Sequence, residues 1–460
     1  MSMYKKDRQN RYSILDTGYS KLETSIENRA ARIEKGLVIV AVLWVVVVLM
    51  ALIAVLGRKA RLDMKVSFAR VESSRCKWAC RAGIEKAIGI LNEDTRESDG
   101  LTDLWSDNDE DLNDIALEGC YFSVRVIDEA SKLNINAATK EQLLWLPNMV
   151  EDIADAIIDW RDNDDMASGS GVEGGYYENL PYGYKIRNGS FRTIRELLLV
   201  KGVTEELFYG EDTNFNGELD YNERDGDKSP PIDDGDDQLD EGWVEYLTCY
   251  SYDRNVDASG NQRINVNSAN ENELESSLGI KRSQARWIVQ NRSSRQYQSI
   301  GDLINENSPR EPSQGSQSDP NATEQLDLQT FYQIADKITV SGGQTQGKVN
   351  INTAPEEVLT ALLGGGDEAE RIAEEIITYR NRSIYGMESI ADLLSSGTVN
   401  LDTFKRIANS IMTRSDVFTI SCFATADRNG NTGATLRTDA VVDRSTMPCQ
   451  ILYWYEGTSN

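Results

Sequence analysis

The feature that most constrains this chain is an uninterrupted apolar run near its N-terminus. Residues 37–57 read LVIVAVLWVVVVLMALIAVLG and carry no charged side chain. A helix needs about 20 such residues to cross the hydrocarbon core of a bilayer. We therefore predict a transmembrane helix over 37–57. The basic residues on its two sides are too balanced for the positive-inside rule to fix its orientation.

Three interpretations of the run compete. A signal peptide has a shorter apolar region with a small-residue cleavage site behind it, whereas Arg58 follows directly here. A plain membrane anchor requires nothing beyond the run itself. A prepilin has a basic leader that ends in Gly and is cleaved before the apolar run, and Gly36 followed by Leu37 meets that requirement.

The helical pattern continues after the run. Apolar and small residues recur at steps of three and four from Leu62 to Leu91, and no proline interrupts 37–93. We predict one continuous helix over 37–93, half in the membrane and half packed on a soluble domain, which is typical of pilins. A membrane helix followed by a separate amphipathic core helix is the alternative.

The chain contains an internal repeat. The pattern basic-apolar-Asn-apolar-Asn-small-Ala occurs at 132–138, 263–269 and 348–354, and each copy leads into a helical pattern. Asn, Ser and Thr before a helix supply caps for its free N–H groups. Each copy therefore predicts a pair of short helices that resembles the helix-hairpin-helix unit.

Helix-hairpin-helix units often bind nucleic acid through a glycine-rich turn that faces a phosphate. Here only the turn at 363–366 is glycine-rich, and acidic residues follow it. The turn with Lys281 and Arg282 is the better candidate. Since the net charge is −27 and nonspecific affinity depends on basic charge, we favour a structural helical domain and expect no nucleic acid.

Residues 212–223 match a calcium-binding loop of the EF-hand type at every fixed position. The predicted ligands are Asp212, Asn214, Asn216, the carbonyl of Glu218, Asp220 and Glu223. Gly226, Pro230 and Pro231 follow too soon for a long exit helix. The carboxylates of Asp234, Asp236 and Asp240 offer a second Ca²⁺ site, and a solvated acidic loop is the alternative for both segments.

The sequence contains no histidine. The commonest general base and zinc ligand is therefore absent, and no nucleophile motif replaces it. We predict that the chain is not an enzyme.

Alternating β-prone segments at 120–127, 417–423, 434–442 and 450–455 predict a small sheet, with a hairpin turn at Asn429-Gly430. The helix, one strand, a long helical insertion and three strands make an α+β fold. The six cysteines are interpreted as small buried residues or structural bridges, and Cys422 with Cys449 is a candidate bridge between neighbouring strands.

The expected organisation has nine segments. They are a leader at 1–36, a transmembrane helix at 37–57, a pilin-like helix and strand at 58–131, a first helical repeat at 132–205, an acidic calcium-binding segment at 206–262, a second repeat at 263–306, a linker at 307–327, a third repeat at 328–415 and C-terminal strands at 416–460.

Several motifs resemble the minor pseudopilins of the GspK family in the bacterial type II secretion system. These motifs are the leader ending at Gly36, the apolar helix, Ala82-Gly83-Ile84-Glu85, Lys132-Leu133-Asn134-Ile135-Asn136, Ile158-Asp159-Trp160 with Asp162 and Asp164, Tyr176-Tyr177, Ile194-Arg195-Glu196-Leu197 and the segment from Val349 to Pro355.

The resemblance implies a pilin-like fold: a long N-terminal helix and a small antiparallel sheet with a large inserted helical domain of the helix-hairpin-helix or SAM-like kind. It implies cleavage and N-methylation by the prepilin peptidase at Gly36/Leu37. It also implies a single-pass protein of the bacterial inner membrane whose C-terminal domain lies in the periplasm.

The same resemblance implies a structural role in protein export across the outer membrane. The chain would join other minor pseudopilins at the tip of a pseudopilus, contact the major pseudopilin, and meet the secreted proteins. Most pilin-like subunits carry Glu at mature position five, where this chain has Ala41, and a tip subunit needs no such carboxylate. The family usually has two Asn-x-Asn units, so the middle one here is an enlargement.

A membrane-anchored DNA receptor with helix-hairpin-helix units, similar to competence proteins, remains the alternative function.

Overall fold

The protein is described from a computed structural model. The described residues are 5–95, 97–212, 219–226, 228–229, 231, 233, 235–311, 322–383, 386–427 and 432–457, with the backbone alone at 5–37 and 432. The chain divides into two compact parts, residues 1–72 and 73–460, which are treated separately.

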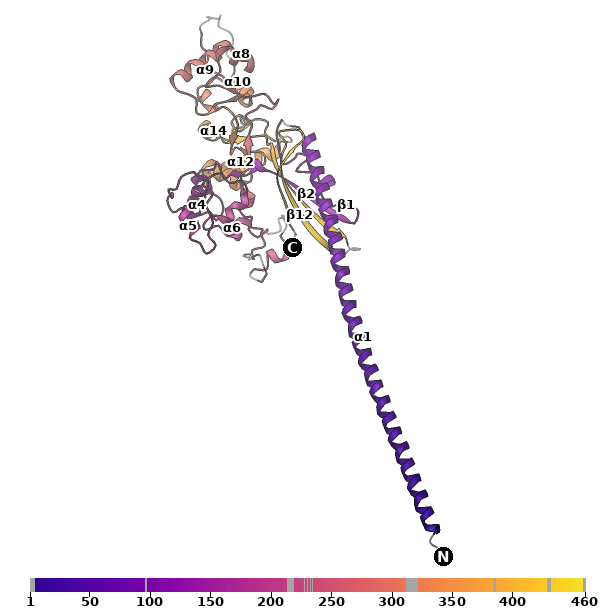
Figure 1. The fold of residues 1–460 in the computed structure, drawn as a ribbon. Helices are drawn as coiled ribbons and strands as arrows, with labels where there is room; N and C mark the ends of the chain where they lie inside the picture. Colours follow the sequence, from indigo (N-terminus) through magenta and orange to yellow (C-terminus); the bar gives the residue numbers. More distant parts are fainter. Residues whose placement is uncertain are drawn as a thin grey trace. The chain divides into compact units, whose positions relative to one another are not determined.

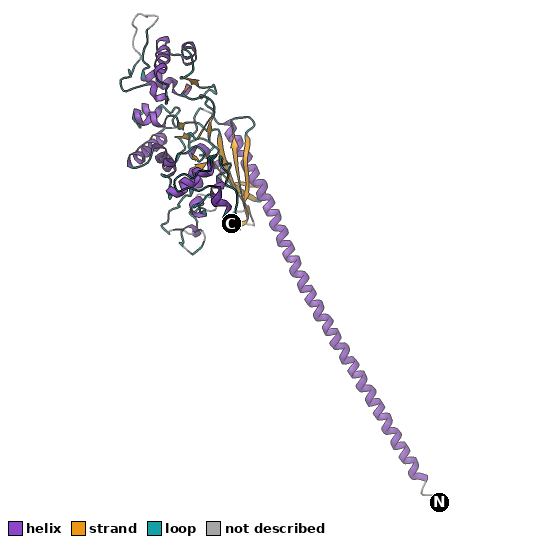
Figure 2. Ribbon diagram, turned by 60° about the vertical axis from the view of Figure 1, so that its left-hand side comes forward, coloured by secondary structure: helices purple, strands orange, loops and turns teal. Residues whose placement is uncertain are grey.

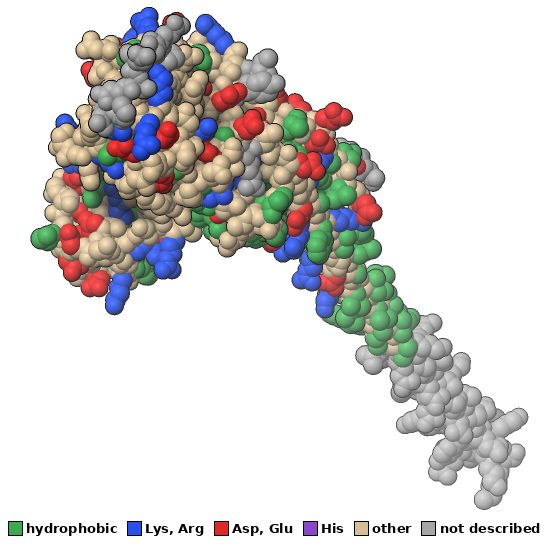
Figure 3. Space-filling view, turned by 90° about the horizontal axis from the view of Figure 1, so that it is seen from above, with side chains coloured by type: hydrophobic (Ala, Val, Ile, Leu, Met, Phe, Trp, Pro, Cys, Tyr) green, Lys and Arg blue, Asp and Glu red, His purple; other side chains and the backbone are tan. Residues whose placement is uncertain are grey.

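The helix α1 (Lys5–Glu93) accounts for the described residues of the first part and continues into the second. It confirms the prediction of a continuous helix through residue 93. From Val38 to Leu56 its large apolar side chains are exposed, and Figure 3 shows them in green along the helix. By length and composition, α1 is the one helix among the described residues that could cross a membrane.

In the second part, the end of α1 packs on a five-stranded antiparallel sheet (Figure 1). The strand order is β1-β2-β11-β12-β13, built from β1 (Ile115–Leu117), β2 (Cys120–Asp128), β11 (Val417–Asp427), β12 (Thr432–Asp443) and β13 (Gln450–Gly457). The four predicted strands are confirmed, and β1 adds a fifth. The predicted Asn429-Gly430 turn lies outside the described residues, although β11 and β12 pair as a hairpin around it.

The contact between α1 and the sheet is close. Cys80, Ile84 and Leu91 are fully buried there, and burying an Ile or Leu side chain stabilises a fold by about 1.5–3 kcal/mol. Gly83 permits the approach, because a Cβ at that position would lie 2.7 Å from Cys422 Sγ and 2.9 Å from Phe122 and Val124.

The helical insertion lies between β2 and β11 and covers the other face of the sheet (Figure 2). Thr419 Oγ1 on β11 donates a 2.5 Å hydrogen bond to Glu129 in the insertion. The guanidinium of Arg195 lies 4.3 Å from the ring centre of Tyr455 on β13. The sheet is therefore the middle layer between α1 and the insertion.

The insertion contains three repeat units, each of which is closed by a two-residue parallel strand pair. The first unit comprises β3 (Leu133–Asn134), α3 (Lys140–Leu143), α4 (Glu151–Arg161), α5 (Gly174–Glu178), η2 (Ile194–Leu199), α6 (Glu205–Tyr209), η3 (Tyr221–Glu223), α7 (Trp243–Tyr246) and β4 (Leu247–Thr248).

The second unit comprises β6 (Ile264–Asn265), α8 (Glu271–Leu278), α9 (Arg282–Ser294), η4 (Ile300–Leu303), α10 (Leu328–Ile334), η5 (Ala335–Lys337) and β7 (Ile338–Thr339). The third unit comprises β9 (Val349–Asn350), α11 (Glu356–Leu363), α12 (Asp367–Arg382), α13 (Asp392–Ser395), α14 (Leu401–Ile407) and β10 (Ile411–Met412).

Four short elements lie outside the units: α2 (Asp109–Leu112), η1 (Glu129–Ser131), β5 (Tyr252–Asp253) and β8 (Thr345–Gln346).

These boundaries differ from the expected ones. Residues 328–339, which were expected to open the third repeat, close the second, because β7 pairs in parallel with β6. Likewise β4 pairs with β3, so the first repeat extends to Thr248 and includes the acidic segment. The helical periodicity of 328–339 carries no information about which strand its last two residues will join.

Candidate functional site

The second asparagine of each repeat motif clamps a distant backbone. Asn136 holds Phe191, Asn267 holds Tyr297 and Asn352 holds Met387. In each clamp the side-chain amide donates to the carbonyl of the held residue, and its oxygen accepts from the N–H of that same residue. The six distances lie between 2.7 and 3.0 Å. A side chain with one donor and one acceptor facing the same way is required, and asparagine provides it.

An arginine at the end of the long helix of each unit completes the framework. Arg292 donates to the carbonyl of Val266 at 2.7 Å. Arg380 donates to two carbonyls of its own motif, Ile351 at 3.0 Å and Ala354 at 2.6 Å. Arg161 makes the corresponding pair of contacts in the first unit. In these bonds, the second Asn of each motif and the Arg join residues of one and the same unit.

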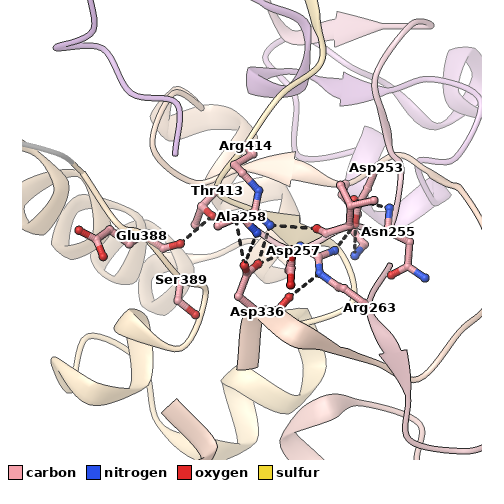
Figure 4. A network of polar contacts seen from close by, with 12 residues as sticks. Asp253, Asn255, Asp257, Ala258, Arg263, Asp336, Glu388, Ser389, Thr413 and Arg414 are labelled. Carbon is pink, nitrogen blue, oxygen red and sulfur yellow. Dashed lines mark hydrogen bonds and ion pairs between the residues drawn. The ribbon is translucent and has the colours of Figure 1, made fainter. Parts of the chain in front are cut away.

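A polar network joins the second unit, the third unit and the segment before β11 (Figure 4). Asp336 forms ion pairs with Arg263 at 3.1 Å and with Arg414 at 2.5 Å. Asp253 forms ion pairs with Arg263 at 2.7 Å and with Lys348 at 2.6 Å. The basic residues that begin the second and third motifs are thus both bound to Asp253, which lies outside the units, and Arg263 is also bound to Asp336 of its own unit.

The hairpin turns give little support to a phosphate site. In the glycine-rich turn, the N–H groups of Gly364 and Gly365 donate to backbone carbonyls. The indole of Trp145 covers this turn, since a Cβ on Gly365 would lie 1.7 Å from the ring. In the second turn, the ammonium group of Lys281 lies 2.8 Å from Glu324.

The structure describes three of the six predicted ligands of the calcium loop, Asp212, Asp220 and Glu223. Asn214, Asn216 and Glu218 lie outside the described residues. Asp212 and Glu223 are buried, and Glu223 Oε2 accepts a hydrogen bond from the backbone N–H of Asp220 at 3.0 Å. Glu223 Oε1 is buried and has no hydrogen-bond partner among the described residues. Burial, together with the charges of Asp212 and Asp220, raises the pKa of Glu223.

The structure supports the second predicted calcium site less than the first. Asp234 lies outside the described residues. Asp236 accepts hydrogen bonds from Gln238 of its own turn, at 2.7 and 2.8 Å. The backbone N–H of Asp240 donates to Glu211 at 3.0 Å. No arrangement of these three residues as a common ligand set is visible in the described part.

A carboxylate cluster that the sequence reasoning did not identify lies in the first unit. Asp159 and Asp162 stand at the C-terminal end of α4, and Glu173 precedes α5. One oxygen from each carboxylate lies within 4.8 Å of the other two. The negative end of the α4 dipole also favours a cation at this position.

Several carboxylate oxygens of this cluster have no hydrogen-bond partner among the described residues. Asp159 is fully buried, and its Oδ1 accepts a 2.9 Å hydrogen bond from the N–H of Ser168. Its Oδ2 and both oxygens of Glu173 are buried without a hydrogen-bond partner among the described residues. Burial, followed by the charges of Asp159 and Asp162, raises the pKa of Glu173 to about 7. Such a set of oxygens fits Ca²⁺, which binds carboxylate oxygens in flexible geometry.

A sequence signal for this cluster did exist. Asp159 and Asp162 are three residues apart near the end of a helix, and therefore lie on one face. Glu173 comes from a separate loop, whose return depends on Gly171. A Cβ on Gly171 would lie 2.0 Å from Asp159 Oδ2.

The predicted processing residues Gly36 and Leu37 lie within α1, where the structure describes only the backbone. The predicted Cys422–Cys449 bridge is wrong in this fold. Cys422 aligns with Thr438 and Glu456, whereas Cys449 precedes Gln450, which aligns with Asp443. At about 3.3 Å per residue, they are roughly 20 Å apart along the sheet, and a disulfide requires Cα atoms within about 7 Å. No disulfide joins any of the six cysteines, all of which lie among the described residues.

Two family models described as type II secretion system (T2SS), protein K, match the chain, one over residues 119–209 and the other over 349–410. The first match covers all of β2 and the first unit as far as the end of α6, and the second covers the third unit almost completely. The second unit, 263–339, falls in neither match. Neither match supports the nucleic-acid alternative.

Among solved structures, a chain of "The Crystal Structure of the GspK-GspI-GspJ complex from enterotoxigenic Escherichia coli Type 2 Secretion System" is similar at 13% identity with a TM-score of 0.45. The similarity covers 85% of this chain and 99% of that chain. No curated protein matches.

Proposed function

We propose that the chain, which matches two models of the type II secretion system protein K family, is a minor pseudopilin of protein secretion that caps the tip of the pseudopilus. The observation that carries this proposal is the position of the two family matches. They fall on the pilin-like sheet with the first unit, and on the third unit.

Two features of the chain support the tip position. The apolar run contains no acidic residue, and position 41 is alanine. Since a buried carboxylate in the membrane is costly unless a neighbouring subunit supplies a partner, its absence suits a subunit with none above it. The inserted units also add bulk to one face of the sheet, which suits a cap.

The proposed partners are other minor pseudopilins in a tip complex, the major pseudopilin below it, and the prepilin peptidase. The proposed location is the bacterial inner membrane, crossed once by α1, with the second part of the chain in the periplasm. Secreted proteins are proposed to meet the tip. The role is structural, and no enzymatic step is proposed.

The test replaces the chain in a strain that lacks it, then measures secretion and the mature N-terminus. The full chain should restore secretion and yield a peptide that begins at N-methylated Leu37. Gly36→Asp should abolish both, because the leader is then retained. Gly57→Ala is the matched control, since a Cβ there meets nothing within 4 Å, and it should behave as the unchanged chain. Full secretion with an uncleaved leader would refute the processing step.

We also propose that the first unit binds Ca²⁺, both at Asp159, Asp162 and Glu173 and at the loop of Asp212, Asp220 and Glu223. Buried carboxylate oxygens without partners are costly, and a cation would satisfy them. Ca²⁺ at one hundred times its Kd should stabilise the unit by about 2.7 kcal/mol.

Calorimetric titration of chelator-treated protein should then show two binding events. Glu173→Gln should remove one, Glu223→Gln should remove the other, and the exposed Glu110→Gln should remove neither. A titration without heat or stabilisation would refute the calcium proposal and leave the secretion role untouched.

A further inference from the structure

One edge of the central sheet is open along most of its length. β1 pairs only with residues 120–122 of β2, and the partners on that side end at Phe122. The remaining residues of β2, from Ser123 to Asp128, pair with β11 on the inner side alone. An unpaired strand edge is a ready template for another extended chain.

The outward-facing groups of this edge can be assigned from the hairpin. Glu118 and Gly119 form the two-residue turn between β1 and β2, with φ values of 40° and 84°. Leu117 and Cys120 therefore exchange both of their hydrogen bonds, as the residues that flank such a turn do. By alternation, Phe122, Val124 and Val126 also direct their N–H and C=O groups outward. No hydrogen bond to those of Val124 and Val126 comes from the described residues outside the sheet.

The described residues leave the edge open to a groove. All six residues from Ser123 to Asp128 line a groove of about 930 Å³. A pocket that continues along a strand edge leaves room for an added strand, which lies about 4.8 Å from its neighbour.

The two walls of the groove differ in chemistry. On the side of Val124 and Val126, which face α1, the wall contains Leu101, Trp105 and Leu112. Leu101 is 45% exposed. The opposite wall belongs to the insertion and contains Glu241 and Glu245. An added strand alternates its side chains between the two faces of the sheet, so it would present apolar residues to one wall and basic residues to the other.

The charges that line the groove support an occupant with basic side chains. Five carboxylates line the groove against two cations, Arg125 and Lys132. Both cations are engaged, Arg125 with Glu245 at 3.5 Å and Lys132 with the carbonyl of Val244 at 2.7 Å. The formal excess of three negative charges favours a basic occupant.

We infer that the groove along the outer edge of β2 binds an extended segment of a partner protein, as an added strand with alternating apolar and basic side chains. Main-chain hydrogen bonds to Val124 and Val126 hold the segment, and the two walls select its side chains. This goes beyond the tip role, because it identifies a peptide-binding surface whichever assembly the chain joins.

The probe is a fluorescein-labelled peptide with four Val-Lys repeats, and its counterpart has four Val-Glu repeats. Binding to the full chain in detergent is measured by anisotropy, and the site is mapped by hydrogen exchange. We expect the lysine peptide to bind at least tenfold more tightly than the glutamate peptide. It should slow amide exchange at Val124 and Val126.

Val126→Pro removes an outward N–H without removing a bond to β11, and Val126→Ala is the matched control that keeps the N–H. The proline variant should weaken binding at least tenfold relative to the alanine variant. If the proline variant does not fold, Glu241→Lys provides the second test. It should weaken binding of the lysine peptide at least threefold.

Four outcomes would overturn the inference. The first is equal binding of the two peptides or of the two Val126 variants. The second is protection along β13, the other outer strand, instead of β2. The third is protection of Val124 and Val126 that rises with protein concentration alone, since a second copy of the chain would then be the occupant. Absence of binding at millimolar peptide would also refute it.

Discussion

Replacement of Asn352 by alanine tests whether the repeated asparagines hold the insertion together. Asn352 is 2% exposed and the residue that it clamps, Met387, is fully buried. The side chain supplies both the acceptor for the Met387 N–H, at 2.8 Å, and the donor for its carbonyl, at 2.9 Å. Alanine removes both and leaves two buried backbone groups without partners.

The size of the effect follows from those two groups. Each buried polar group left unsatisfied costs about 1–3 kcal/mol. The cavity left by the amide can admit water, which lowers the sum, so we expect about 2–4 kcal/mol. Because 1.36 kcal/mol corresponds to a tenfold change, local opening of the third unit should become roughly 30- to 1,000-fold more frequent.

Native-state hydrogen exchange with mass spectrometry is the suitable assay, because a chain with several units need not unfold in one step. Peptides from 349–363 and 386–395 should exchange faster in Asn352→Ala. Asn267→Ala should have a smaller effect on the second unit, since Asn267 is only half-buried and water can replace its amide. Asn108→Ala is the control, because its side chain caps the exposed helix α2 outside the units.

An increase of less than threefold in the third unit would refute the reasoning. So would an equal increase from Asn108→Ala, since an exposed cap contributes about 1 kcal/mol and only to its own helix.

Three further predictions follow from single contacts. Burial alone would raise the pKa of Asp253, but Lys348 and Arg263 outweigh it and lower that pKa to about 2. The carboxylate therefore contributes about 2 kcal/mol to the free energy of unfolding above pH ~4, and this contribution is lost as the pH falls towards ~2. The free energies of unfolding of Asp253→Asn and of the unchanged chain, measured in urea, should converge over that range. Gly83→Ala gains about 1 kcal/mol of helix propensity but forces a Cβ against Cys422, so thermal unfolding should show net destabilisation of about 1–3 kcal/mol. Gly89→Ala, with nothing within 4 Å of its Cβ, should stabilise the same helix; a stabilising Gly83→Ala would contradict the packing argument. Alkylation of denatured protein followed by mass spectrometry should find no Cys422–Cys449 bridge, and its detection would refute the sheet register.

Local patterns in the sequence determined a large part of this protein. The run at 37–57 predicts α1, because its composition alone decides whether a helix can cross a membrane. Alternation at 417–423 and 434–442 predicts two central strands, because the period of two belongs to the strand itself. The three Asn-x-Asn motifs predict three units, because the same local bonds recur in each. Those bonds also explain how the second asparagine of each motif stabilises the fold.

Only the tertiary structure decided what depends on distant residues. The return of the 168–173 loop brings Glu173 to Asp159. The six-residue stagger between Cys422 and Cys449 separates two cysteines that were candidates for a bridge between neighbouring strands. The pairing of β7 with β6 assigns 328–339 to the second unit. The early end of β1 opens the edge of β2. None of these can be predicted from periodicity, because register, loop return and strand order arise from long-range contacts whose free energies are set by the whole fold.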